Sequence, residues 1–309
     1  MMIWFWLVLG FVFLLLVAVF FISQSFQNAR FPHRITPSDH GIPFEEVHFP
    51  TKNQRRLYGW WIPASRSGGA TSPHTLILVH GWGRNLERTM PYITHLHPRG
   101  YNLLAFDARH HGSSDPDRIS SMLKFAEDIM AAVVYVAERQ KHSSDAKIGV
   151  IGLSVGGAAA IYASAHEPRI CCAVAVGAFA HPVDIISYEF KRRHVPFYPL
   201  GWLVLQYIQY RIRARFHAFA PVNHIARSRA RILLVHGEKD RTVPVEQAHK
   251  LYQAAASDRV QLLLYPDRGH SDCHESEGFW EKLEEFLETC LANCEPADVS
   301  SRNSIAASY

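Results

Sequence analysis

Short apolar runs alternate with longer segments of helical spacing along most of this sequence of 309 residues. Most of the runs are continuous in Val, Ile, Leu and Ala instead of alternating with polar residues, which is typical of strands buried on both faces of a parallel sheet. The first two runs alternate more strictly and predict an antiparallel hairpin at the sheet edge. The predicted strands are Glu46–Phe49, Leu57–Pro63, Thr75–His80, Tyr101–Asp107, Ile148–Leu153, Ile170–Val176, Ile232–His236 and Gln261–Tyr265.

Helical spacing between these runs completes the prediction of the fold class. The predicted helices are Met122–Arg139, Gly156–Ala165, Val245–Ala256 and Gly278–Leu291. Strand–helix alternation without an internal repeat predicts an α/β fold with a doubly wound, mostly parallel sheet of eight strands. Residues 179–230 interrupt the alternation, and structureless loops of such length are uncommon. Because this stretch contains an aromatic, amphipathic run at Phe197–Phe216, we predict a helical lid over one edge of the sheet.

The first 22 residues carry no charge, and only Gly10 lies outside the hydrophobic set. A helix of that length spans roughly 33 Å, against about 30 Å of bilayer hydrocarbon. A cleaved secretory signal is the alternative, but it would have a basic start, a shorter apolar run and a small-residue cleavage site. We therefore predict a transmembrane anchor at 1–22, a linker at 23–43, one domain at 44–294 and a disordered tail at 295–309.

The orientation of this anchor follows from the charges beside it. Arg30 and Arg34 come after the apolar segment, and no basic side chain precedes it. By the positive-inside rule, the body of the protein then faces the cytoplasm. The odd number of five cysteines agrees with a reducing compartment. Cys171 and Cys172 lie inside an apolar run and are expected to be ordinary core residues.

A G-x-S-x-G motif, Gly152–Gly156, directly follows the apolar residues Ile148–Ile151 of a predicted strand and opens an Ala-rich helix. A strand, this pentapeptide and a helix form the context of a nucleophile elbow, in which a sharp turn exposes the serine above the sheet. The alternative is a strand-to-helix turn without chemistry. The flanking elements favour Ser154 as a nucleophile.

A serine nucleophile needs a base, and the base needs an acid to orient it. Asp240 follows the strand that ends at His236, and His270 follows the last strand. Both positions are carboxyl ends of strands, where an open α/β sheet places its site. We predict Asp240 as the acid and His270 as the base. Glu238 and Asp272 remain alternative acids, and His274 remains an alternative base.

The run that ends in His80-Gly81-Trp82-Gly83 can aim a backbone N–H group at a developing oxyanion. The donors would be the N–H groups of Trp82 and of Val155, the residue after the nucleophile. The alternative is a glycine-rich turn with an exposed tryptophan.

Elbow, oxyanion turn, acid loop and histidine loop occur in an order and at strand ends that resemble the alpha/beta-hydrolase superfamily. Phe106–Ser114 is similar to that family's D-x-R-x-x-G-x-S loop, and Val235–Pro244 is similar to its acid loop. The entry segment Pro43–Pro63 resembles that of bacterial membrane-anchored hydrolases of the serine aminopeptidase-like or prolyl-oligopeptidase-like type. The resemblance implies a Ser-His-Asp mechanism without a cofactor, at a bacterial plasma membrane. It leaves the substrate open.

Other classes of protein are disfavoured by composition and motifs. The 48% of hydrophobic residues argues against a disordered chain, and five cysteines are too few for a disulfide scaffold. No dinucleotide fingerprint or phosphate-binding glycine loop is present, and we expect no nucleic-acid partner. His270 and His274 lack the helical H-E-x-x-H context, so we expect no metal site. Cys273 is predicted to lie near the active site.

Three functions follow, in order of preference. The first is a serine hydrolase that cleaves a carboxylic ester, of a small molecule or a lipid, through an acyl-enzyme. The second is a peptidase or amidase of the same fold, and the third is a catalytically silent, membrane-anchored binding module. Aromatic residues of the lid line an acyl pocket in one interpretation and pack the lid onto the body in the other. The lid residues that we select as candidates for contact with the substrate are Tyr188, Phe197, Trp202 and Tyr207.

Basic residues are concentrated in the same lid. The whole chain has a net charge of +4, whereas Phe179–Arg231 holds nine Lys or Arg against two acidic residues, or +7. The remainder of the chain is therefore at −3. Two interpretations remain open: solvated helix faces, or contact of the lid with an anionic lipid surface.

Overall fold

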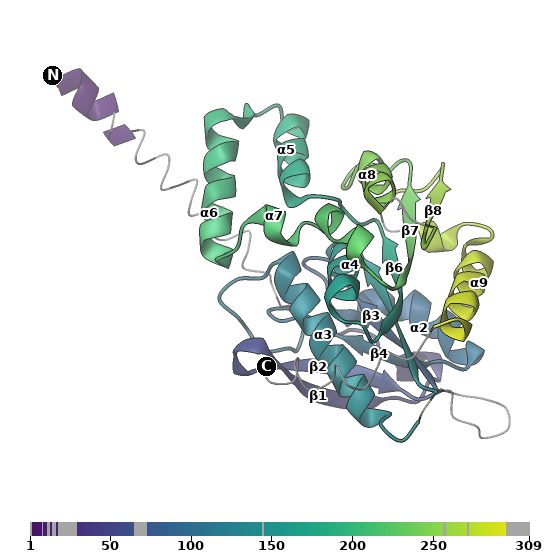
Figure 1. The fold of residues 1–309 in the computed structure, drawn as a ribbon. Coiled ribbons are helices and arrows are strands. Elements are labelled where there is room, and N and C mark those ends of the chain that lie inside the picture. Colours follow the sequence, from purple (N-terminus) through teal and green to yellow (C-terminus); the bar gives the residue numbers. More distant parts are fainter. Residues whose placement is uncertain are drawn as a thin grey trace.

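An eight-stranded sheet forms the centre of the molecule (Figure 1). The computed structural model describes residues 30–64, 73–143, 145–255, 258–270 and 272–294, and a few residues between positions 2 and 17. The strand order is β1-β2-β4-β3-β5-β6-β7-β8. The strands are β1 (Glu45–Thr51), β2 (Arg55–Ile62), β3 (His74–Val79), β4 (Asn102–Phe106), β5 (Lys147–Leu153), β6 (Ile170–Val176), β7 (Arg231–Gly237) and β8 (Val260–Tyr265). Each predicted strand is confirmed.

The sheet is mostly parallel, with antiparallel pairing confined to one edge. β1 pairs with β2 and β2 pairs with β4 in antiparallel fashion. All later neighbours, from β4–β3 to β7–β8, are parallel. The residues of β1 alternate between exposed and buried, whereas all seven residues of β6 are buried. The sequence patterns therefore distinguished the edge hairpin from the buried strands correctly.

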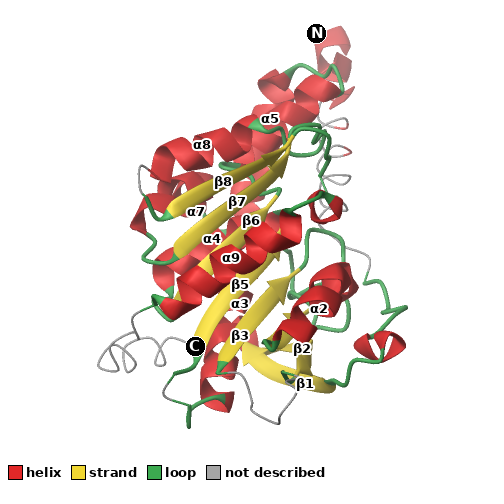
Figure 2. Ribbon diagram, turned by 90° about the vertical axis from the view of Figure 1, so that its right-hand side faces the viewer, coloured by secondary structure: helices red, strands yellow, loops and turns green. Residues whose placement is uncertain are grey.

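Helices cover both faces of the sheet (Figure 2). α3, α4 and α8 pack on one face through side chains such as Ile129, Ile161 and Leu251. α2 and α9 pack on the other face through Ile93 and Leu283. The helices are α2 (Met90–Leu96), α3 (Met122–Arg139), α4 (Val155–His166), α5 (Pro182–Arg192), α6 (Trp202–Ile212), α7 (Phe216–Phe219), α8 (Glu246–Ala255) and α9 (Phe279–Ala292). The fold is thus the predicted doubly wound α/β fold.

The segment Arg30–Pro43, which we call the N-terminal strap, packs against the body. His33 Nε2 lies 2.8 Å from Asp107 Oδ2, and its ring stacks on Tyr58. Asn85 Nδ2 donates to two strap carbonyls at 3.3 Å each. Burial works against protonation of His33, but the Asp107 carboxylate outweighs it and raises the pKa of this imidazole. The strap is therefore fixed beside the loop that follows β3.

The predicted membrane anchor lies largely outside the described residues, and so does the predicted tail. Among the residues that are described, none of the helices combines the length and the hydrophobicity needed to cross a bilayer.

Cys171 forms a disulfide with Cys294, so the prediction of an ordinary core cysteine is wrong at this position. The end of α9 lies against the start of β6, which brings the two Cα atoms to 5.7 Å although 123 residues separate them. Cys172 is buried as a free thiol, as expected. Because disulfides are typical of oxidising compartments, the cysteines no longer support the predicted cytoplasmic orientation.

Candidate active site

Ser154 occupies the turn between β5 and α4. Its backbone angles, φ 56° and ψ −118°, lie outside the regions that a serine ordinarily adopts. The turn is tight enough that a Cβ on Gly152 would lie 2.3 Å from the carbonyl oxygen of Gly156. The Ser154 N–H donates to the Val176 carbonyl at 2.7 Å, which ties the turn to β6. The local sequence thus builds the strained elbow that its G-x-S-x-G pattern predicts.

His270 and Asp240 meet Ser154 from two loops that follow β8 and β7. His270 Nε2 lies 2.9 Å from Ser154 Oγ, and His270 Nδ1 lies 2.6 Å from Asp240 Oδ2. An ionised carboxylate can only accept hydrogen bonds, so the proton of a neutral His270 ring belongs on Nδ1. Nε2 is then an acceptor for the Ser154 hydroxyl. The structure therefore brings the three predicted residues into one hydrogen-bonded chain.

Asp240 is held as a carboxylate by its surroundings. Its Oδ1 accepts the N–H groups of Thr242 and Val243 at 2.8 and 2.9 Å. His236 Nε2 lies 3.4 Å from Oδ2. Burial alone would raise the pKa of Asp240, but hydrogen bonds from His236 and His270 outweigh burial and hold this pKa well below its usual range. The acid is therefore a carboxylate at neutral pH.

A pocket of about 410 Å³ opens over Ser154 and His270. Its walls come from the carboxyl ends of the parallel strands, where an open α/β sheet binds ligands. The described lining residues are Gly81, Trp82, Arg84, Arg88, Tyr92, Leu153, Ser154, Val176, Thr242, His270, Cys273 and His274. None of them is acidic.

The two predicted oxyanion donors flank this nucleophile. Val155 is the first residue of α4, so its N–H belongs to the first turn, where backbone donors have no partner within the helix. Trp82 lines the pocket in the turn after β3. Gly81 brings that turn close, since a Cβ there would lie 3.3 Å from Ser154 Cβ.

Comparison with known proteins agrees with this arrangement. The model of the prolyl oligopeptidase family matches residues 123–294, which is more than half of the chain. The chain belongs to this family. The alpha/beta-hydrolase superfamily, inferred from the sequence motifs, is thereby confirmed, and the protein is a hydrolase of the prolyl oligopeptidase family.

Relatives and solved structures match this hydrolase over most of its length. The uncharacterized protein YfhR of Salmonella typhimurium is 24% identical and covers 91% of this chain and 94% of its own. The esterase Pf2001 of Pyrococcus furiosus is 25% identical, with a TM-score of 0.69 over 86% of this chain and 98% of its own. The acylaminoacyl peptidase of Pyrococcus horikoshii is 15% identical, with a TM-score of 0.65 over 84% of this chain and 44% of its own. The last of these shows the shared fold alone.

The alternative acids and base have other surroundings. Glu238 is exposed, and Asp272 Oδ1 accepts the N–H of Gly269 at 2.7 Å within the histidine loop. The His274 ring faces Tyr92 and Trp280 at the edge of the pocket. Among the described residues, His270 is the histidine that is hydrogen-bonded to Ser154.

Cys273 lines the pocket, as predicted, but its thiol is a weak nucleophile. Burial, with smaller influences from Asp272 and Asp240, raises the pKa of the Cys273 thiol to about 12. Since the thiolate is the reactive form, this cysteine does not compete with Ser154 as a nucleophile.

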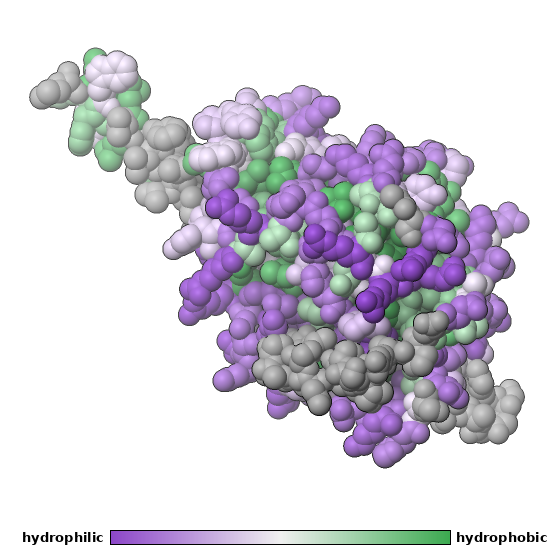
Figure 3. Space-filling model, in the orientation of Figure 1, coloured by the Kyte–Doolittle hydropathy of each residue, from purple (hydrophilic) through white to green (hydrophobic). Residues whose placement is uncertain are grey.

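The lid residues form an arm of α5 and α6 that projects from the body (Figure 1). Hydrophobic surface lies over this arm among hydrophilic side chains (Figure 3). Tyr188, Phe197, Trp202 and Tyr207 are absent from the described pocket lining. Phe197 packs over Gly201, Trp202 is 47% exposed, and the Tyr207 hydroxyl accepts a hydrogen bond from Arg211. These three therefore serve the arm itself in this structure.

Tyr188 makes the one direct link between these lid aromatics and the acid loop that the described residues show. Its hydroxyl donates to the Arg241 carbonyl at 3.4 Å, next to Asp240. The arm is thus joined to the loop that carries the acid.

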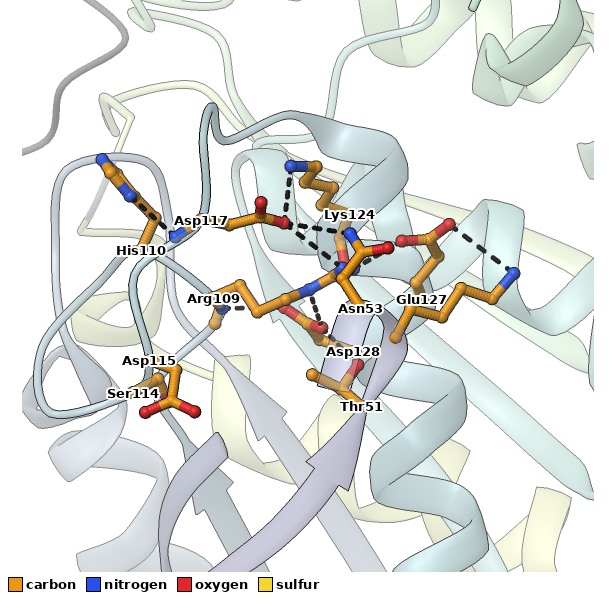
Figure 4. A network of polar contacts seen from close by, with 12 residues as sticks. Thr51, Asn53, Arg109, His110, Ser114, Asp115, Asp117, Lys124, Glu127 and Asp128 are labelled. Atoms are coloured by element: carbon orange, nitrogen blue, oxygen red, sulfur yellow. Dashed lines mark hydrogen bonds and ion pairs between the residues drawn. The ribbon is translucent and has the colours of Figure 1, made fainter. Parts of the chain in front are cut away.

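A second charged cluster joins the D-x-R-x-x-G-x-S loop after β4 to α3 (Figure 4). Arg109 is 1% exposed and bonds Asp128 at 2.6 Å and Glu127 at 2.5 Å. Thr51 donates to Asp128 at 2.8 Å. Burial raises the pKa of Asp128 to about 6, despite the opposing influence of Arg109. This cluster fixes the loop to α3, and Ser154 takes part in none of the hydrogen bonds and ion pairs that the described residues of the cluster make.

Three features of the site were not foreseen from the sequence: His236 beside Asp240, and Arg84 and Arg88 in the pocket wall. The two arginines follow the His-Gly-x-Gly turn. Arg84 lies in a loop and Arg88 in a 3-10 helix of four residues, Leu86–Thr89, which is too short to show periodicity, so their position in the pocket becomes visible only in three dimensions.

Proposed function

We propose that this protein is a serine hydrolase that cleaves a carboxylic ester through an acyl-enzyme on Ser154. One observation carries the proposal: the chain Asp240–His270–Ser154 ends at a pocket, with bonds of 2.6 and 2.9 Å between its members. The strained turn at Ser154 supports it, because such strain is typical of nucleophile elbows.

In the first half-reaction, Ser154 Oγ bonds to the ester carbonyl carbon while its proton moves to His270 Nε2. The carbonyl π electrons move to oxygen, and the N–H groups of Trp82 and Val155 stabilise this oxyanion. The ionised Asp240 stabilises the imidazolium. When the intermediate collapses, the bond to the alcohol oxygen breaks and His270 returns the proton to that oxygen.

In the second half-reaction, water replaces the serine hydroxyl in the same geometry. His270 Nε2 takes a proton from a water molecule while the oxygen of that water attacks the acyl carbon. Collapse of this second intermediate releases the carboxylic acid, and the proton returns to Ser154 Oγ. No cofactor enters either step.

An ester is favoured over a peptide by the lining of the pocket. Capture of a peptide amino terminus calls for carboxylates, and the described lining contains none. The 25% identical esterase Pf2001, matched over 98% of its length, supports the same choice.

Peptide or amide cleavage is the second candidate, since the matching family is described as the prolyl oligopeptidase family. The acyl-transfer steps are the same, but the leaving amine needs full protonation by His270.

Hydrolysis of paired chromogenic substrates tests the proposal. We expect turnover of 4-nitrophenyl butyrate and octanoate with kcat/KM at least about 100-fold above that of alanyl and N-acetylalanyl 4-nitroanilides. Ser154→Ala is expected to lower kcat on the esters by roughly 10⁴- to 10⁶-fold, while the exposed Ser113→Ala serves as the matched control. Faster anilide cleavage would favour the peptidase, and full ester turnover by Ser154→Ala would contradict the mechanism.

A further inference from the structure

A second cavity adjoins the Ser154 pocket and has a volume of about 750 Å³. One wall is the N-terminal strap, including Phe31, Arg34 and His40, and the other is the segment from Gly83 to Thr94. Arg84 and Arg88 line both this cavity and the Ser154 pocket. The two spaces therefore share a wall that contains two guanidinium groups.

The charge of this shared wall is positive. Arg34, Arg84 and Arg88 line the two spaces, and Glu87 is the one acidic residue in their described lining. Glu87 Oε1 accepts the backbone N–H groups of Arg34 and Ile35, the latter at 2.7 Å. That carboxylate therefore holds the strap in place. Within the described part of the chain, Arg84 has no ion-pair partner, and its side chain is exposed.

We propose that Arg84 and Arg88 bind an anionic group, a carboxylate or a phosphate, carried by the ester substrate. Guanidinium groups bind both anions through paired N–H donors, and they remain charged at any physiological pH. Arg84 lies two residues after the oxyanion donor Trp82, and its N–H bonds the Gly81 carbonyl at 3.3 Å. The two arginines thus follow directly on the turn that contains Trp82, and an ester that lies along the shared wall contacts both Ser154 and these arginines.

The inference deepens the proposed ester hydrolysis and rests on it. It names a substrate class: esters with a negative charge close to the scissile bond. The second cavity gives room for the charged part of the molecule, while the Ser154 pocket holds the carbonyl.

Two pairs of esters test this assignment, and the members of each pair differ in one anionic group. The acyl-side pair is 4-nitrophenyl hemiglutarate and its methyl ester. The alcohol-side pair is 1-butyrylglycerol 3-phosphate and 1-butyrylglycerol. The ratio of kcat/KM within each pair is compared between wild type, the double variant Arg84→Gln/Arg88→Gln and the control Arg118→Gln. Arg118 is exposed and lies outside both linings.

We expect the double variant to lower the anionic-to-neutral ratio by roughly 10- to 100-fold in one of the pairs, in line with charge-assisted hydrogen bonds. The responding pair tells whether the acyl or the alcohol part carries the charge. Arg118→Gln is expected to keep the wild-type ratio, and Arg84→Lys to lose part of it, since it retains charge without the planar fork.

Ratios that stay unchanged in both pairs, with esters still hydrolysed, would overturn the anion site and leave the proposed function intact. An equal fall of the ratio in Arg118→Gln would also overturn it, because the effect would then be one of overall charge. Wild-type protein that hydrolyses none of the four esters would contradict the proposed function, and this inference with it.

Discussion

Asp240 and Asp128 are two buried carboxylates, paired with His270 and Arg109, and the surroundings of these two basic side chains differ. Both side chains are 0% exposed, and each bonds a basic side chain at 2.6 Å. Behind Asp128, Arg109 is enclosed by Glu127 and Asp117. Behind Asp240, His270 is 20% exposed and reaches Ser154 at the floor of a pocket. A buried pair becomes a candidate for chemistry when its far end opens onto a nucleophile and a cavity.

The two carboxylates also differ in the direction in which their pKa values move. Burial dominates at Asp128 and raises its pKa to about 6. At Asp240 burial is outweighed by hydrogen bonds from His236 and His270, with further help from the backbone at Val243, so its pKa falls. The first cluster is therefore expected to govern stability, and the second to govern turnover.

Asp240→Asn should have the largest effect. It leaves the shape of the side chain intact but removes the acceptor that keeps the His270 proton on Nδ1. We expect kcat on 4-nitrophenyl butyrate to fall by roughly 10⁴-fold, with KM nearly unchanged. A fall of less than about 10-fold would show that this carboxylate does not orient the base.

Arg109→Met should act on stability instead. It leaves the Asp128 carboxylate buried without its cation, and breaking such a pair typically costs about 3–5 kcal/mol of the free energy of unfolding. Urea unfolding measures this loss, with Arg118→Met as the control from the same loop, expected to change stability by less than about 0.5 kcal/mol. Ester turnover by the folded fraction should remain. Loss of turnover without loss of stability would reverse the roles of the two clusters.

Should Arg109→Met fail to fold, Arg109→Met/Asp128→Leu keeps the comparison testable. Replacing both members of a buried pair by apolar side chains is often tolerated. The double variant should therefore be more stable than the single one.

Asp128→Asn should give the smallest effect, in the pH dependence of stability. The folded carboxyl keeps its proton up to a pH of about 6, whereas the unfolded one, with the ordinary aspartate pKa of 3.8, loses its proton at lower pH. The folded state thus binds more protons in this window, so the contribution of Asp128 to stability falls as the pH rises. Between pH 5 and 7, wild type should lose on the order of 1 kcal/mol of the free energy of unfolding relative to Asp128→Asn. If wild type instead became more stable relative to Asp128→Asn as the pH rises, ion pairing with Arg109 would outweigh burial in setting the pKa of Asp128.

Strands marked by an apolar run, and motifs formed by consecutive residues, could be predicted from the sequence. Continuous apolar runs marked β3 to β8, and the elbow at Ser154 was evident from five consecutive residues. α2 was missed because seven residues give too little helical periodicity. The order of the strand ends then sufficed to select Asp240 and His270.

Long-range contacts explain most of what the sequence did not reveal. The Cys171–Cys294 disulfide depends on where α9 ends against β6. The contact of His33 with Asp107 joins residues 74 positions apart. The shared wall of Arg84 and Arg88 exists only because the N-terminal strap folds back over the turn after β3. None of these contacts corresponds to a periodic pattern or a local motif in the sequence.

Labelling with a fluorophosphonate probe tests the central claim most directly, because the probe reacts with a serine only when a neighbouring base activates it. Peptide mass spectrometry should place the adduct on Ser154 in the wild type and in Arg109→Met. Labelling should be absent from Ser154→Ala and greatly slowed in Asp240→Asn. An adduct on another residue, or equal labelling of Ser154→Ala, would contradict the assignment of Ser154 as the nucleophile.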